Sequence, residues 1–340
     1  MPPAPVALVP RPVAASLEEL LEGATRLGEH VPADARSSAG FERVEVDGEA
    51  CIVKYVDPTR DFILREAGDI ACRPRRVWAS GLMDVCPDLI DHAHLGAAPW
   101  GPNGWGAALL MRDVSRELIP VGDGPVTEEQ HLAFLDAIAG LAARMWGWTD
   151  DIELMPHATR WGFFGSAMVE CEQALGFPEA VPRIAADGWN RFDARVPDDV
   201  REPLRELRRD PDPISRALLD TPQTFIHGDW KFGNVGVGTD GRVVLLDWAY
   251  PGQGPVAHEL GWYLALNHAR FPTGHTKEST IDALRAALER HGIGTDGWWD
   301  RQVDLCLLGA TVQFGWEKAH GDDAELSWWI DRAREGLRRL

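Results

Sequence analysis

Two stretches of the chain alternate apolar and polar residues with the period of a β-strand. The first, FERVEVDGEACIVKYV at 41–56, turns at Asp47-Gly48, a pair that favours tight two-residue hairpins. We therefore predict a β-hairpin with Lys54 on its second strand. The second comprises extended segments at 234–237 and 242–246 on either side of the turn sequence GTDG. A hairpin there would place its two ends, Asn234 and Asp247, beside each other.

Helical spacing of apolar residues dominates the rest of the chain. Asp57-Pro58 can open a helix that runs to about residue 71 and carries Phe62, Glu66 and Ile70 on one face. After an apolar strand, ALLMRDV at 108–114, helical spacing resumes near Thr127. Its predicted buried stripe consists of Leu132, Leu135, Ile138, Leu141 and Met145. Further helices are predicted at 160–175, 198–219, 256–270, 278–291, 297–318 and 324–339.

These elements predict an α+β fold in two lobes. A chain of 340 residues exceeds what one hydrophobic core usually supports, so a cleft between lobes is expected. The strands and the first helix fall in an N-terminal lobe at 1–114, and a mainly helical C-terminal lobe takes 115–340. Clefts between lobes are favoured ligand sites. Polar side chains gather at one end of the second hairpin, so we consider that end a candidate site.

Composition and charge narrow the kinds of molecule that the protein is expected to bind. The formal charge of −19 disfavours nucleic acid and anionic membranes as partners, because both bind clusters of Lys and Arg. The same charge would suit a cationic small molecule. Five scattered cysteines without a CxxC pair indicate reduced thiols. The N-terminal prolines interrupt the apolar run that a signal peptide needs, and no segment reads as a membrane span. We expect a cytoplasmic protein.

The second hairpin and the loop before it carry polar side chains that suit phosphoryl transfer. Hard Mg²⁺ prefers oxygen ligands, which the carboxylate of Asp247 and the amide oxygen of Asn234 provide. Asp229 can accept the proton of an attacking hydroxyl, and Lys231 can place positive charge near the transferred phosphate. A solvated surface lysine is an equally good interpretation of Lys231. These groups predict a site in which the protein positions a nucleophile and neutralises phosphate charge.

The motif HGDWKFGN, followed by the apolar strand VVLLDW, resembles the catalytic loop and metal-binding segment of the aminoglycoside phosphotransferase and choline kinase-like family. The resemblance implies a bilobal protein kinase-like fold and transfer of the γ-phosphate of ATP or GTP, with Mg²⁺, to a hydroxyl of a small metabolite or antibiotic. Asp229 would be the base, and Asn234 and Asp247 the metal ligands. Glu259, in GPVAHELGWYLA, matches the acidic residue that braces the catalytic loop.

In the first lobe, the resemblance implies the nucleotide site. Lys54 followed by Glu66 is similar to the kinase pair that holds the α- and β-phosphates, with Asp61 and Asp69 as possible substitutes for Glu66. The strand and hinge from Met111 to Val114 would receive the adenine. No G-x-G-x-x-G precedes the first hairpin, so backbone N–H groups from Ser37 to Gly40 would cradle phosphate instead.

Two other functions stay open from the sequence. His-x-Asp and Gly-Asn fragments also occur in metal-dependent phosphoesterases, although His258 is the only further ligand candidate nearby. A kinase-like protein that binds nucleotide without catalysis is the other alternative, favoured by the weak phosphate loop. The fifteen tryptophans could stack on an acceptor. For most of them, including Trp161, core packing is the better interpretation.

Overall fold

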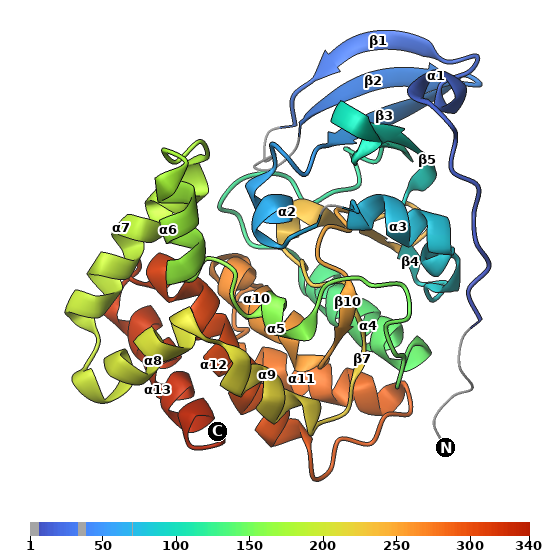
Figure 1. Cartoon of the computed structure of the whole chain (residues 1–340). Coiled ribbons are helices and arrows are strands. Elements are labelled where there is room, and N and C mark those ends of the chain that lie inside the picture. The colour runs from blue at the N-terminus through green and yellow to red at the C-terminus, as the bar shows by residue number, and fades with distance from the viewer. Residues whose placement is uncertain (1–6, 33–38, 70) are drawn as a thin grey trace.

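An antiparallel sheet forms the upper part of the molecule and stands over a larger body of helices (Figure 1). The computed structural model describes residues 7–32, 39–69 and 71–340. Within these residues the sheet has five strands in the order β1-β2-β3-β6-β5. Their bounds are Thr25–His30 (β1), Gly40–Val46 (β2), Glu49–Val56 (β3), His94–Trp100 (β5) and Gly106–Arg112 (β6).

The predicted first hairpin is confirmed by β2 and β3. Val46 pairs with Glu49, so Asp47 and Gly48 form a two-residue loop. Both have positive φ, 52° and 83°, which is the backbone that this type of tight turn requires. Lys54 lies on β3, opposite Leu109 of β6, in the interior of the sheet.

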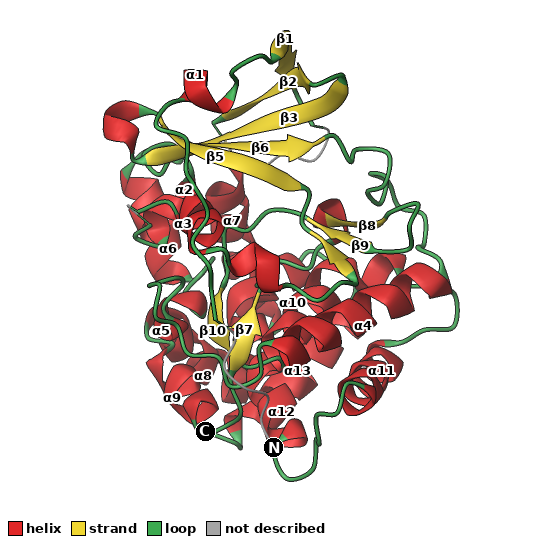
Figure 2. Ribbon diagram, turned by 90° about the vertical axis from the view of Figure 1, so that its right-hand side faces the viewer, coloured by secondary structure: helices red, strands yellow, loops and turns green. Residues whose placement is uncertain are grey.

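The second predicted hairpin is also present, as β8 (Val235–Val237) and β9 (Val243–Leu245). It lies between the five-stranded sheet and the helices (Figure 2). The short β4 (Ile90–Asp91) pairs with β9 in parallel, so the chain before β5 is tied to this hairpin. A third sheet joins β7 (Thr224–Ile226) to β10 (Gly252–Gly254). The lobe boundary between residues 114 and 115 stays a prediction.

The helices lie mostly below the sheets. Their bounds are Leu17–Leu20 (α1), Phe62–Glu66 (α2), Arg73–Ser80 (α3), Glu128–Arg144 (α4), His157–Arg160 (α5), Ser166–Ala174 (α6), Ala180–Arg195 (α7), Asp198–Arg209 (α8), Asp212–Leu219 (α9), Ala257–Asn267 (α10), Lys277–Arg290 (α11), Trp299–Lys318 (α12) and Asp323–Leu337 (α13). In the part of the chain that is described, none of them is long and apolar enough to span a membrane.

The helix predicted to begin at Asp57-Pro58 is much shorter than expected. Asp57 instead forms a turn in which its carboxylate accepts hydrogen bonds from Thr59, and Asp61 caps α2 by accepting from the N–H of Ile63. Gly68, with φ of 61°, ends the helical path. Ile70 lies outside the described residues.

Other helix predictions need smaller corrections. The predicted helix at 160–175 is split between α5 and α6, where Phe164 has a positive φ of 59°. The predicted helix at 198–219 is split at Pro211, which cannot donate a helical hydrogen bond. Leu132 of the predicted α4 stripe is 42% exposed, while its other four members are buried. The helices α1, α3 and α7 were not predicted.

The centre of the helical body is α12, which is buried on nearly every side. Trp161, just after α5, is fully buried and packs its ring on Gly309 of α12. A Cβ on Gly309 would lie 2.3 Å from two atoms of this ring. Trp161 is thus a core residue, and Gly309 is required here because α12 and the indole approach each other so closely.

We expect Gly309→Ala to destabilise the protein by about 1–3 kcal/mol, because the added methyl must displace a fully buried indole. Gly294→Ala is the matched control, since a Cβ there meets no atom within 4 Å. It should leave stability unchanged or raise it by about 0.4–1 kcal/mol. Chemical denaturation followed by circular dichroism measures both, and equal stabilities for the two variants would contradict this packing.

Candidate active site

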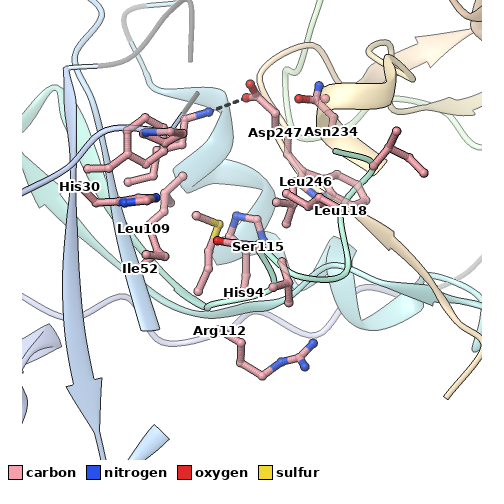
Figure 3. A pocket seen from close by; sticks show the side chains of 18 of the residues that line it. His30, Ile52, His94, Leu109, Arg112, Ser115, Leu118, Asn234, Leu246 and Asp247 are labelled. Atoms are coloured by element: carbon pink, nitrogen blue, oxygen red, sulfur yellow. Dashed lines mark hydrogen bonds and ion pairs between the residues drawn. The ribbon is translucent and has the colours of Figure 1, made fainter. Parts of the chain in front are cut away.

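The hairpin β8–β9 brings the predicted metal ligands together. Its antiparallel register pairs Val235 with Leu245, and the N–H of Leu246 donates to the carbonyl of Asn234 at 2.9 Å. The next residue, Asp247, therefore lies beside Asn234, as Figure 3 shows. Asp247 adopts a positive φ of 62°, a strained backbone for a residue with a side chain. Such strain is commonly found where a side chain must be aimed at a functional site.

Asp229 lies in the loop between β7 and this hairpin and is 3% exposed. Its Oδ2 accepts a hydrogen bond from Asn234 Nδ2 at 2.8 Å, and Lys231 Nζ is 4.0 Å from the same oxygen. Burial raises the pKa of Asp229 to about 6, although Lys231 opposes the shift. In the described chain, its other oxygen, Oδ1, is buried and accepts no hydrogen bond. One oxygen of this buried carboxylate therefore keeps an unmet hydrogen-bonding capacity.

Lys54 reaches across from β3 and donates to Asp247 Oδ1 at 2.7 Å (Figure 3). Burial disfavours the charged form of Asp247, but the positive charges of Lys54 and Lys231 outweigh it and lower the pKa of this carboxyl. Asp247 is therefore anionic at neutral pH. It is the group on this hairpin best suited to bind a cation.

The residues at this position fit Mg²⁺. Asn234 uses its Nδ2 toward Asp229, so its amide oxygen is the atom left for a metal. Together with the anionic Asp247, this provides two hard oxygen donors, and Mg²⁺ commonly takes its remaining ligands from phosphate and water.

The loop that carries Asp229 is held from below by Glu259, near the start of α10. Glu259 accepts hydrogen bonds from the N–H groups of His227 and Gly228, at 2.5 and 3.0 Å. Burial raises the pKa of Glu259 to about 7, opposed by the nearby Arg160 guanidinium. The loop brace predicted from the sequence is thus present, with Glu satisfying two buried backbone donors.

His227 has a structural role in this loop. Its Nδ1 accepts a hydrogen bond from the N–H of Asp229 at 3.2 Å, which shapes the loop. Burial lowers the pKa of His227 to about 3, so the ring stays neutral at ordinary pH. The ring also packs edge-on against Trp248, 4.8 Å between centroids.

The predicted pairing of Lys54 with Glu66 is wrong in this structure. Lys54 pairs with Asp247, whereas Glu66, at the end of α2, hydrogen-bonds to Glu172 of α6. The reason is the short α2, which does not continue along the face that the sequence suggested. Of the two substitutes considered, Asp61 is near enough for Lys54 to lower its pKa, though burial dominates and raises it to about 6. Asp69 instead caps α3 by accepting from the N–H of Arg73.

One cavity of about 350 Å³ unites most of the predicted nucleotide-binding and metal-binding residues. The predicted residues that line it are Lys54, Met111, Val114, Lys231, Asn234 and Asp247. Its walls come from the five-stranded sheet on one side and the β8–β9 hairpin on the other (Figure 3). Apolar walls with a polar end that carries two lysines and a carboxylate match a nucleoside triphosphate in shape and charge.

Three titratable cavity residues were missed by the sequence analysis: His30, Arg43 and His94. Each lies on a strand, and no sequence motif distinguishes it from an ordinary polar residue on the protein surface. The proposed phosphate cradle from Ser37 to Gly40 begins among residues outside the described part of the chain. Its role therefore stays a prediction.

The chain is similar to known phosphotransferases. The model of the phosphotransferase enzyme family (APH) matches residues 79–298. A search of curated protein sequences finds no match. Among solved structures, a microcompartment-associated aminopropanol kinase is similar with 13% identity and a TM-score of 0.50, over 96% of this chain and 97% of that chain. This likeness shows the bilobal kinase-like α+β fold.

Two further solved structures are similar at lower TM-scores, both 0.46. The choline kinase from Streptococcus pneumoniae shares 13% identity over 95% of this chain and 96% of that chain. The macrolide 2′-phosphotransferase from Brachybacterium faecium shares 14% identity over 93% of this chain and 97% of that chain.

The hydrogen-bonded Glu66 and Glu172 predict a pH-dependent stability. Burial raises the pKa of Glu66 to about 7, and the hydrogen bond to Glu172 adds to the shift, so folding favours the protonated form. This contribution is complete below the unfolded pKa and is lost as pH rises through about 7. We expect the melting temperature to fall between about pH 5 and pH 8, and Glu66→Gln to make the fall shallower, because an amide donates without a titrating proton.

Thermal unfolding across this pH range measures the effect. Glu45→Gln, at an exposed position on β2, is the control and should reproduce the slope of the unmodified protein. A Glu66→Gln slope as steep as the control would show that this pair does not share a proton.

Proposed function

The chain belongs to the phosphotransferase enzyme family, and from this premise we propose that it is a kinase that transfers the γ-phosphate of ATP or GTP to a hydroxyl of a small molecule. The observation that carries the proposal is that Lys54, Asn234 and Asp247 line one cavity, while Asp229 is hydrogen-bonded to Asn234 and Lys54 to Asp247. In phosphoryl transfer, the protein mainly positions the reactants and neutralises charge. This set of residues can do both.

Asp229 orients the acceptor hydroxyl and takes its proton. With a pKa of about 6, this carboxylate is ionised at neutral pH and yet basic enough to share a proton in the transition state. Its bond to Asn234 Nδ2 fixes the rotation of the carboxylate, and Oδ1, which accepts no hydrogen bond from the described residues, is the atom that would take the proton. Glu259 holds the loop in place through the backbone of His227 and Gly228.

The cationic groups bind and hold the phosphates. Lys54 carries its charge on the sheet side of the cavity, and Lys231 carries another on the loop side. Asn234 and Asp247 would hold Mg²⁺, which when bound neutralises negative charge on the phosphate oxygens. Met111 and Val114 line the apolar part of the cavity, where the base would lie.

The acceptor belongs to a broad class of small alcohols. Aminoglycosides, other amino sugars, neutral sugars, choline-like alcohols and nucleoside antibiotics all carry a suitable hydroxyl. The formal charge of −19 favours cationic members of this class, because the protein field raises their local concentration. Incubating the protein with Mg²⁺, ATP or GTP and an acceptor library, and measuring nucleoside diphosphate release, tests the proposal. Product formation separates a kinase from a protein that only binds nucleotide.

A phosphoesterase with several histidine and aspartate ligands has less support. Within the described residues, no group of three or more His, Cys, Asp or Glu side chains is arranged to hold a metal ion. His258, the one further candidate in the sequence, is buried beside Trp161 and Trp262.

Asp229→Asn should lower kcat by about 10²- to 10⁴-fold, because the amide cannot take the proton of the acceptor. Nucleotide affinity should change little. Asp240→Asn, at the exposed turn of the same hairpin, is the matched control and should keep full activity. In the unmodified protein, kcat/KM should rise with pH through about 6, since the required form of Asp229 is the anion. Full turnover by Asp229→Asn would refute the mechanism.

Asp247→Asn should raise the Mg²⁺ concentration needed for half-maximal activity, by about tenfold or more, because a neutral amide replaces the anionic ligand. Chelation of divalent ions should abolish turnover of the unmodified protein, and added Mg²⁺ should restore it. Activity assays over a Mg²⁺ titration measure both effects. An unchanged Mg²⁺ requirement in Asp247→Asn would exclude this carboxylate as a ligand.

A further inference from the structure

His94 is a buried histidine in the wall of the cavity, and it has no part in the mechanism above. It lies on β5, opposite Met111 of β6, and only 5% of its surface is exposed. Apolar side chains, among them Leu109 and Leu246, line the same cavity. Figure 3 shows the side chain of His94 directed from β5 toward the cavity. A polar ring in such a position has an unmet hydrogen-bonding capacity that a ligand can use.

The structure determines which ring nitrogen carries the proton. His94 Nδ1 lies 2.6 Å from the carbonyl oxygen of His92, and a carbonyl can only accept, so Nδ1 is the donor. Burial lowers the pKa of His94 to about 3, so the ring holds a single proton at neutral pH. Nε2 is therefore a bare acceptor. Among the described residues, no donor is hydrogen-bonded to it.

The N–H of His94 adds a second constraint. It donates to Nδ1 of His92 at 3.0 Å, so the two histidines are joined by a pair of local hydrogen bonds. The ring orientation is thus fixed before any ligand enters. A preorganised acceptor in an apolar wall favours ligands that present a donor and disfavours those that present another acceptor.

The position of His94 relative to the phosphate end indicates which part of a nucleotide would meet it. Lys54 and Asp247 mark the phosphate end. Lys54 on β3 and His94 on β5 flank β6, opposite Leu109 and Met111, and all three of Lys54, Asp247 and His94 line the cavity. In a nucleotide with the anti conformation, the 5′-phosphates lie on the same side of the base as N7 and the 6-substituent. The side of the cavity toward Lys54 therefore faces the 6-position of a purine.

We propose that His94 selects adenine over guanine nucleotides by accepting a hydrogen bond from the 6-amino group through Nε2. The inference rests on the proposed function and assigns the phosphate donor of that same site as ATP. Guanine and hypoxanthine carry a carbonyl oxygen at position 6. That oxygen would face the lone pair of Nε2 with no hydrogen between them, and both acceptors would lose their water without compensation.

The first test uses the unmodified protein and measures binding without an acceptor. Isothermal titration calorimetry with Mg²⁺ compares ATP, inosine triphosphate, GTP and purine riboside triphosphate, which has hydrogen at position 6. ATP should bind about 10-fold more tightly than purine riboside triphosphate, because one hydrogen bond is lost. It should bind about 100-fold more tightly than inosine triphosphate, because two buried acceptors then oppose each other. Equal affinity for ATP and inosine triphosphate would overturn the proposal.

The second test changes the protein. His94→Gln presents either an oxygen or an NH₂ group after rotation of its amide, so ATP and inosine triphosphate should then bind within about threefold of each other. Leu95→Gln is the matched control, because Leu95 neighbours His94 on β5 but is 46% exposed, and it should keep the selectivity of the unmodified protein. Circular dichroism verifies that each variant is folded, and if His94→Gln is not, the nucleotide series above decides alone. Retained selectivity in folded His94→Gln would overturn the role of this residue.

The two levels of the proposal fail in different ways. Selective binding of ATP without product from any acceptor would contradict the kinase function and leave His94 as the determinant of base selection. Phosphoryl transfer from GTP at the same efficiency as from ATP would support the kinase and overturn the role of His94. Absence of binding by every triphosphate would overturn both.

Discussion

The ion pair between Lys54 and Asp247 is the interaction on which the arrangement of the site depends. It joins the interior of the five-stranded sheet to the end of the β8–β9 hairpin, across 193 residues of chain. Both side chains are largely shielded from water, so each charge needs the other as long as no ligand is present. The pair links β3 to Asp247 across the cavity that both residues line. It also holds the lysine where a triphosphate would need it.

Electrostatics separates two carboxylates of the same segment into different roles. Burial has the largest effect on Asp229 and raises its pKa to about 6, which suits the base that we propose. Asp247 is partly shielded from water as well, but two lysines outweigh that effect and lower its pKa, which suits the metal ligand that we propose. Neighbouring groups whose pKa values are pushed apart in this way are typical of acid–base sites. The two functions thus follow from the positions of Lys54 and Lys231 and need no difference in residue type.

The sequence predicted those parts of the fold that local chemistry dictates. The Asp47-Gly48 turn, the hairpin across GTDG and the long helices α11, α12 and α13 all follow from turn residues and apolar spacing. The prediction of Glu66 as partner of Lys54 failed, because a helix boundary decides which side chains share a face. Asp61 and Gly68 shorten α2, and Glu66 then meets Glu172, a residue more than a hundred positions away. No local pattern contains that contact.

By itself, the sequence determined the chemistry of the catalytic loop, because HGDWKFGN and the following apolar strand constrain Asp229, Asn234 and Asp247 within one short segment of chain. The tertiary structure alone decided what surrounds them. It paired Lys54 with Asp247, and it enclosed the apolar part of the cavity. It also left Nε2 of His94 as an acceptor in that wall, since the protonation of this ring depends on the carbonyl of His92 and on burial by strands far apart in sequence. No local motif in a single sequence reveals a side chain whose role depends on long-range packing. A side chain whose role depends on a short loop is revealed by the motif of that loop.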